Sequence, residues 1–165
     1  MSVVNVGLIG YGLTGAVFHA PLIHAEKGLK LTAISTSRAL GPDLAGVTRV
    51  KSGWEIISDP AIDLVVVASP NDTHASFARA TLLAGKHVVV DKPFTIRLSE
   101  AEALVELAEA RGQSTASKIP VRPAPKALRT CSDVNCKAIG RIQQSFYWLR
   151  KFRMRVQAVP PSAKS

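Results

Sequence analysis

Hydrophobic residues recur along the first two thirds of the chain with two different spacings. Four short apolar runs suit strands, at residues 3–9, 29–34, 64–68 and 87–90. The third run, Leu64 to Ala68, is continuous and rich in valine, which is typical of a parallel strand buried on both faces. Apolar residues at helical spacing occupy residues 16–24, 75–84 and 101–108. The alternation predicts an α/β fold with a doubly wound parallel sheet.

Single residues mark where these elements begin and end. Pro21 is expected to end or kink the first helix, and Gly85 to end the second. Ser99 and Glu102 have the spacing of a capping box for the third helix, which we expect to close at Gly112. The expected order of elements is β-α-β-(loop)-β-α-β-α.

The segment between the second and third runs carries weaker signals. Residues 47–50 form a short candidate strand in a loop-rich stretch. Trp54, Ile56 and Ile57 are expected to cover a sheet edge, because a large aromatic residue is more often core than ligand contact. We therefore treat Trp54 as a packing residue.

Three glycines follow the first strand and precede the first helix. Gly10 permits the tight turn, Gly12 lets the backbone approach a pyrophosphate, and Gly15 lets helix and strand pack. The N–H groups at the helix start would face the diphosphate. The spacing alone is a weak signal, but its place between a strand and a helix favours a dinucleotide site over a structural turn.

The end of the second strand decides which dinucleotide such a site takes. An acidic residue there binds the ribose 2′-hydroxyl of NAD, whereas an arginine admits the 2′-phosphate of NADP. This chain has Thr36, Ser37 and Arg38 at that point and no carboxylate. The pattern favours NADP, with NAD as the alternative cofactor. A solvated loop that happens to hold an arginine is the other interpretation.

Polar residues also follow the third and fourth strands. Ligands of open α/β sheets bind outside the carboxyl ends of strands. Ser69, Pro70, Asn71 and His74 leave the third strand, where Asn71, Asp72 and Thr73 would also cap the next helix. Asp91 and Lys92 leave the fourth, and the Lys92 ammonium could lie against a substrate hydroxyl.

The composition changes abruptly near Gly112. Residues 1–112 hold ten Lys and Arg against eleven Asp and Glu, a net charge of −1, whereas residues 113–165 hold eleven against one, a net charge of +10. No apolar run approaches the ~18 residues of a membrane span, and no export signal is recognisable. Cys131 and Cys136 form neither a disulfide framework nor a zinc set, so we expect no metal and a cytoplasmic location.

Four motifs together resemble the Gfo/Idh/MocA oxidoreductases, named for glucose–fructose oxidoreductase and inositol dehydrogenase. They are G-L-I-G-Y-G-L-T-G at residues 7–15, F-H-A-P-L-I at 18–23, P-N-D-T-H at 70–74 and G-K-H-V-V-V-D-K-P-F at 85–94. The resemblance covers residues 3 to about 112. It implies an NAD(P)-binding Rossmann domain at residues 1–112, normally followed by a larger substrate domain, and hydride transfer on sugars, inositols and related polyols.

The resemblance also implies roles for individual residues. The family's E-K-P lysine falls on Lys92, the catalytic candidate, with Asp91 in place of the usual glutamate. Asn71 and His74 fall where family members line the nicotinamide half of the cofactor, although His74 could equally serve packing at the helix start. The remaining cofactor-binding candidates are Gly10, Tyr11, Gly12, Leu13, Thr14, Gly15, Thr36, Ser37, Arg38, Ser69 and Pro70.

The chain departs from the family after Gly112. The family's D-x-x-x-H motif usually supplies the proton-transfer histidine, and no histidine here has an aspartate four residues before it. Residues 113–165 lack strand alternation and hold almost no acid, which predicts a disordered basic tail from a reading-frame shift or an aberrant exon junction.

Two functions remain open at this point. One is a family enzyme that binds cofactor but turns over poorly as this chain alone, with a polyol as its substrate in the complete architecture. The other is a non-catalytic dinucleotide-binding module whose basic tail, with aromatics interleaved at residues 146–155, engages an acidic partner or nucleic acid. A disordered solvated tail is the simpler interpretation, so nucleic acid is disfavoured. A homo-oligomer is compatible with either function.

Overall fold

A computed structural model of the chain describes residues 3–113 and 115–117. Six strands form one sheet: β1 Val4–Ile9, β2 Leu29–Ser35, β3 Thr48–Val50, β4 Leu64–Val67, β5 His87–Val90 and β6 Thr115–Ser117. Their order is β3-β2-β1-β4-β5-β6, and every pair is parallel. The order reverses between β1 and β4, so the loops after these strands diverge and leave a crevice at the carboxyl edge.

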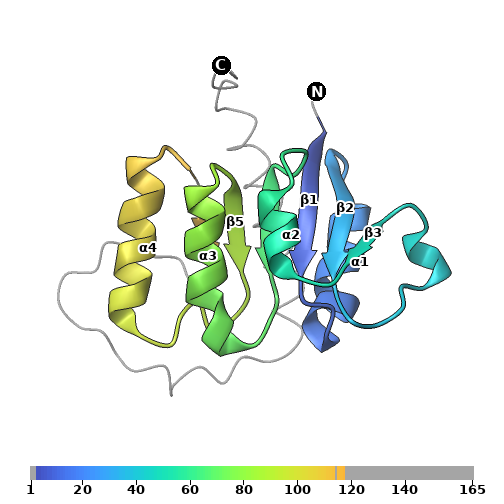
Figure 1. Cartoon of the computed structure of the whole chain (residues 1–165), viewed down its shortest axis with the longest axis horizontal. Coiled ribbons are helices and arrows are strands. Elements are labelled where there is room, and N and C mark those ends of the chain that lie inside the picture. The colour runs from blue at the N-terminus through green and yellow to red at the C-terminus, as the bar shows by residue number, and fades with distance from the viewer. Residues whose placement is uncertain (1–2, 114, 118–165) are drawn as a thin grey trace.

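Helices cover both faces of the sheet. They are α1 Ala20–Ala25, α2 Gly53–Ser58, α3 His74–Leu83 and α4 Leu98–Ala110. In Figure 1 the sheet is seen past α2, α3 and α4, while α1 packs on the opposite face. This arrangement confirms the predicted doubly wound α/β fold.

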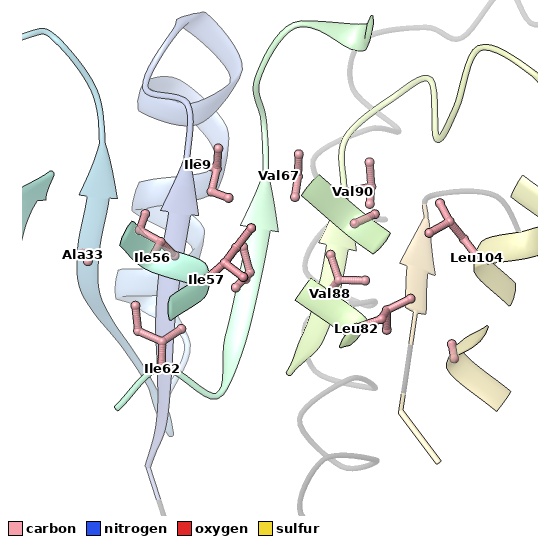
Figure 2. Packing of buried hydrophobic residues seen from close by; sticks show 13 residues of the cluster. Ile9, Ala33, Ile56, Ile57, Ile62, Val67, Leu82, Val88, Val90 and Leu104 are labelled. Atoms are coloured by element: carbon pink, nitrogen blue, oxygen red, sulfur yellow. The ribbon is translucent and has the colours of Figure 1, made fainter. Parts of the chain in front are cut away.

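The central strands are buried on both faces, as their valine-rich sequence predicts. Leu64 and Val66 join the cluster that α1 covers, whereas Val65 and Val67 join the cluster beneath α2, α3 and α4. Figure 2 shows the second cluster, with Ile56 of α2 and Leu82 of α3 packed toward strand residues. Alternate residues therefore fill two cores, and the sheet is the rigid layer between them.

The first helical segment does not end at Pro21 as predicted. A π-helical turn, Gly15–His19, leads directly into α1, and Pro21 lies in the first turn of α1. The N–H of Ala20 bonds to the carbonyl of Gly15, five residues back. Pro21 has no N–H to add to this hydrogen-bond ladder, yet the helix continues to Ala25.

Three other expectations about helix ends and packing need correction. No side chain caps α3, and the Thr73 hydroxyl donates instead to the Pro70 carbonyl. Helix α4 begins at Leu98, and the Glu100 carboxylate accepts from the Arg97 N–H, so the predicted Ser99 and Glu102 box does not form at its start. Trp54 is 52% exposed on α2, where it contacts the ring of Phe77 rather than filling the core.

The sheet also continues past the predicted domain boundary. Strand β6, Thr115–Ser117, pairs with β5 in the segment where we expected no strand. Gly112, at φ +61°, ends α4 as predicted, but it is a turn within the domain. The expected disorder of the basic tail, beyond β6, concerns residues outside the described part of the chain. No described helix has the length and apolarity needed to cross a membrane.

Candidate cofactor site

The glycine turn lies at the carboxyl end of β1, in the crevice where the strand order reverses. Gly10 has φ +95°, a conformation that side chains disfavour, and a Cβ there would press on the backbone of Ala68 and Ser69. A Cβ on Gly15 would overlap the carbonyl oxygen of Gly10. Both glycines are therefore required by the fold itself.

Gly12 differs from the other two glycines of the turn. A Cβ built on it meets no atom within 4 Å, so the space over its backbone is open. Gly12 also lines a cavity of about 510 Å³. An open glycine at the start of a helix is what a closely approaching diphosphate needs, and this geometry fits a dinucleotide.

The cavity brings together the ends of four strands. Its walls come from β1, β2, β4, the β3–α2 turn and α3: Ile9, Gly10, Gly12, Ser35, Lys51, Ser52, Gly53, Ala68, Ser69, Pro70 and Phe77. Of the predicted cofactor residues, Gly10, Gly12, Ser69 and Pro70 lie in this wall. The other seven were not predicted, although the carboxyl-edge rule applied after residue 50 would have singled out Lys51: Ile9, Ser35, Lys51, Ser52, Gly53, Ala68 and Phe77.

The predicted 2′-phosphate residues lie beside the cavity. Thr36, Ser37 and Arg38 follow β2 directly, and the Thr36 N–H donates to the Val50 carbonyl at 3.0 Å. The Arg38 N–H donates to the Thr36 hydroxyl at 3.1 Å, which folds the segment into a short turn. Ser37 and Arg38 are exposed, so their side chains are accessible to a ligand.

His74 is buried between two loops and is absent from the cavity wall. Its side chain is 1% exposed. Nδ1 lies 2.7 Å from the Pro93 carbonyl oxygen and Nε2 lies 2.9 Å from the Ser69 carbonyl oxygen. The ring therefore connects the loop that follows β4 with the loop that carries Lys92. Asn71 is exposed in the short 3-10 turn Asn71–Thr73.

Lys92 is exposed at the carboxyl end of β5, and its neighbour Asp91 is buried. The Asp91 Oδ1 accepts from the Lys92 N–H at 2.9 Å. Its Oδ2 lies 3.6 Å from Nε2 of His19, which belongs to the π-helical turn. Asp91 thus links the backbone of Lys92 to the first helical segment, a contact that the sequence analysis did not foresee.

The three remaining predicted residues lie in the turn into the first helix. Leu13 is 75% exposed, while Tyr11 and Thr14 are partly exposed. The Ala16 N–H bonds to the Gly12 carbonyl, so helical bonding begins immediately after the glycine turn. Among the described residues, no His, Cys, Asp or Glu side chains group in a way that could hold a metal ion.

Comparison with known proteins agrees with this geometry. Residues 4–117 match the family model for the GFO/IDH/MocA oxidoreductase family with an NAD-binding Rossmann fold. The chain belongs to this family. As a Gfo/Idh/MocA member, it contains an NAD(P)-binding oxidoreductase domain, and the match extends through β6 rather than stopping at Gly112.

Two curated relatives illustrate the extent of the likeness. An uncharacterized oxidoreductase of Escherichia coli, YdgJ, is 49% identical over 67% of this chain and 32% of its own length. The scyllo-inositol 2-dehydrogenase (NADP(+)) IolW of Bacillus subtilis is 40% identical over 66% of this chain and 31% of its own length. The chain thus matches about one third of the length of these Gfo/Idh/MocA relatives.

A solved structure shows the same fold. The structure of a putative oxidoreductase from Klebsiella pneumoniae superposes with a TM-score of 0.68 at 46% identity, and the match covers 70% of this chain and 34% of that one. This Gfo/Idh/MocA domain therefore shares its Rossmann architecture with that solved structure.

Proposed function

We propose that the chain binds NADP(H) at the crevice between β1 and β4 and contributes the cofactor half of a polyol dehydrogenase. The open backbone of Gly12, beside the cavity, carries this proposal. The glycine turn and the helix start would hold the diphosphate, and the cavity would take the adenosine. Bound there, the nicotinamide would accept or supply the hydride.

Preference for NADP over NAD is supported by the chemistry at the end of β2. An aspartate or glutamate there would repel a 2′-phosphate, whereas Thr36 and Ser37 can donate hydrogen bonds and Arg38 can donate charge-assisted ones. The relative IolW, whose name specifies NADP(+), supports the same preference.

Lys92 is the residue that we assign to the substrate. It lies beyond β5 on a backbone fixed by Asp91, and its ammonium is exposed toward solvent at the carboxyl edge. An ammonium there can donate to the hydroxyl or carbonyl oxygen of a polyol or its oxidised form. The name of IolW, an inositol dehydrogenase, makes an inositol or a related polyol the substrate class that we propose.

Turnover by this chain alone is expected to be weak. Removal of a hydroxyl proton by a positioned base contributes roughly 10²–10⁴-fold to such a reaction. Such a base must be held against the substrate hydroxyl, and Lys92 is exposed in the described structure. Orientation of the alcohol, worth up to ~7–11 kcal/mol, also requires a closed pocket.

The proposal is tested by titrating the chain with NADPH and NADH in a calorimeter. We expect NADPH to bind at least about ten-fold more tightly, and Arg38→Ala to remove most of that difference by weakening NADPH alone. Tighter binding of NADH would contradict the preference, and binding of neither nucleotide would contradict the proposed function. Assays with NADP and inositols should stay near background, and robust turnover would overturn the expectation of weak activity.

A further inference from the structure

Lys51 is the one charged residue in the wall of the cavity within the described part of the chain. It follows β3 directly and begins the turn into α2. The other wall residues are glycines, serines, a proline and apolar side chains. A single ammonium in an otherwise neutral wall indicates where an anionic part of a ligand would be favoured.

The backbone of Lys51 is held in place at the turn. The Glu55 carboxylate accepts from the N–H of Lys51 at 3.1 Å and from the N–H of Ser52 at 2.8 Å. This carboxylate belongs to the capping box of α2. The box anchors the turn and leaves the exposed Lys51 side chain to extend from a fixed point.

The sheet register brings Lys51 beside the segment that we assign to the 2′-phosphate. Ser35 of β2 is the partner of Val50 of β3, and the Thr36 N–H donates to the Val50 carbonyl. Residues 36–38 and residue 51 therefore leave neighbouring parallel strands at the same level. Nη1 of Arg49 lies 3.5 Å from the Ser37 carbonyl oxygen, which adds a weak contact between the two segments.

The positive charges of this region are not neutralised by ion pairs. Within residues 3–113, Arg38, Arg49 and Lys51 make no salt bridge, and Glu55 is bound to backbone N–H groups. Arg38 follows β2, Arg49 lies in β3 and Lys51 follows β3, and these neighbouring cations form a site that suits a group with more than one negative charge. A phosphate monoester carries about −1.5 to −2 charge at pH 7.

We propose that Lys51 is a second specificity-determining cation for the 2′-phosphate of NADP and acts together with Arg38. The inference rests on the proposed function, because it assumes that the cavity takes the adenosine of the cofactor. Arg38 provides the planar, forked donor, and Lys51 provides a compact positive charge from the turn that follows β3. Arg49 helps to hold the segment after β2 in place through its contact with the Ser37 carbonyl oxygen.

The experiment compares 2′,5′-ADP with 5′-AMP by calorimetry on the full chain, because these two probes differ only in the 2′-phosphate. NADPH and NADH are titrated in parallel. We expect Lys51→Ala to weaken the binding of 2′,5′-ADP and NADPH by about five- to ten-fold, with the binding of 5′-AMP and NADH changed less than about two-fold. Lys51→Arg should retain most of the affinity, since it retains the charge.

Two comparisons make the result specific to Lys51. Lys30→Ala removes an exposed lysine from the amino end of β2, far from the cavity along the strand, and should leave all four affinities unchanged. The double variant Lys51→Ala with Arg38→Ala should lose less than the product of the two single losses, because both cations contact one phosphate.

The outcomes separate this inference from the proposed function. If Lys51→Ala keeps the wild-type ratio of 2′,5′-ADP to 5′-AMP affinity while Arg38→Ala lowers it, the role of Lys51 is overturned and NADP binding stands. Equal loss of both probes in Lys51→Ala would also overturn it, because that result indicates a general effect on the cavity. If the wild-type chain binds none of the ligands, the proposed function fails and this inference fails with it.

Discussion

His74 shows how one buried side chain can connect two functional loops. Its ring lies between the Ser69 carbonyl, which belongs to a residue of the cavity wall, and the Pro93 carbonyl, which follows Lys92. Carbonyl groups buried without a partner cost roughly 1–3 kcal/mol each. The ring thus supports both the shape of the cavity and the position of the catalytic candidate.

We expect His74→Ala to lower the free energy of unfolding by about 2–4 kcal/mol, because it removes a buried ring together with the N–H that donates to one of the two neighbouring carbonyls. Urea denaturation measures the change. Asn71→Ala, an exposed substitution three residues away, should stay within about 0.5 kcal/mol of the wild type. A His74→Ala variant as stable as the wild type would contradict the bridging role.

The role of a residue could be predicted from the sequence where it depends on local geometry. It could not be predicted where the partners of the residue lie in loops that are distant in the sequence. Gly10 and Gly15 were identified because a strand, a turn and a helix within ten residues define their surroundings. The partners of His74 and the contact between His19 and Asp91 depend on how separate loops meet at the sheet edge. The spacing of apolar residues along the chain carries no information about contacts between distant loops.

In the glycine turn, one glycine is needed for folding and another is proposed to be needed for ligand binding. Gly15 is closely packed against the Gly10 carbonyl, whereas Gly12 faces open space. The two positions therefore offer a matched pair of substitutions.

Gly15→Ala should destabilise the chain by about 1–3 kcal/mol, because the added methyl group must displace backbone. Gly12→Ala should change stability by less than about 1 kcal/mol and yet abolish measurable NADPH binding, because the methyl group enters the space proposed for the diphosphate. Thermal unfolding and calorimetric titration measure the two effects. Normal NADPH affinity in Gly12→Ala would exclude the diphosphate from that space.

Element types were more predictable than element ends. The runs at 29–34, 64–68 and 87–90 became β2, β4 and β5, because short valine- and leucine-rich runs bury well in a parallel sheet. Strand β6 was missed because Thr115–Ser117 has no apolar pattern and forms through backbone pairing with β5. The start of α4 was misplaced because Glu100, and not Ser99, supplies the contact to the preceding N–H.

At the scale of the whole molecule, the two edges of the sheet have different chemistry. The carboxyl edge carries the glycine turn, the exposed cations and Lys92, whereas the amino edge carries partly buried charges. There Nζ of Lys86 donates to the carbonyls of Asp59 and Ile62. Burial lowers the pKa of His87 below its usual 6.5, and the charge of Asp63 opposes that shift.

The lowered pKa of His87 predicts how stability depends on pH. In the unfolded chain His87 binds a proton near pH 6.5, whereas in the folded chain burial keeps it neutral at that pH. The contribution of His87 to the free energy of unfolding is therefore fully present above pH 6.5, and it is lost as pH falls through the folded-state pKa. Urea denaturation between pH 7.5 and 5 should show this loss. His87→Gln should make the dependence shallower, and an unchanged slope would assign it to other groups.

The direction of β6 has a consequence for protein engineering. Ser117 is the register partner of Val90, so β6 ends at the edge of the sheet from which Lys92 emerges. A polypeptide grafted after Ser117 would start beside the proposed site, whereas one grafted after Gly112 would start at the opposite edge and displace β6. A chimaera that borrows the downstream region of a longer relative should therefore be joined at Ser117, where the incoming module begins at the carboxyl edge, next to the strand that precedes Lys92.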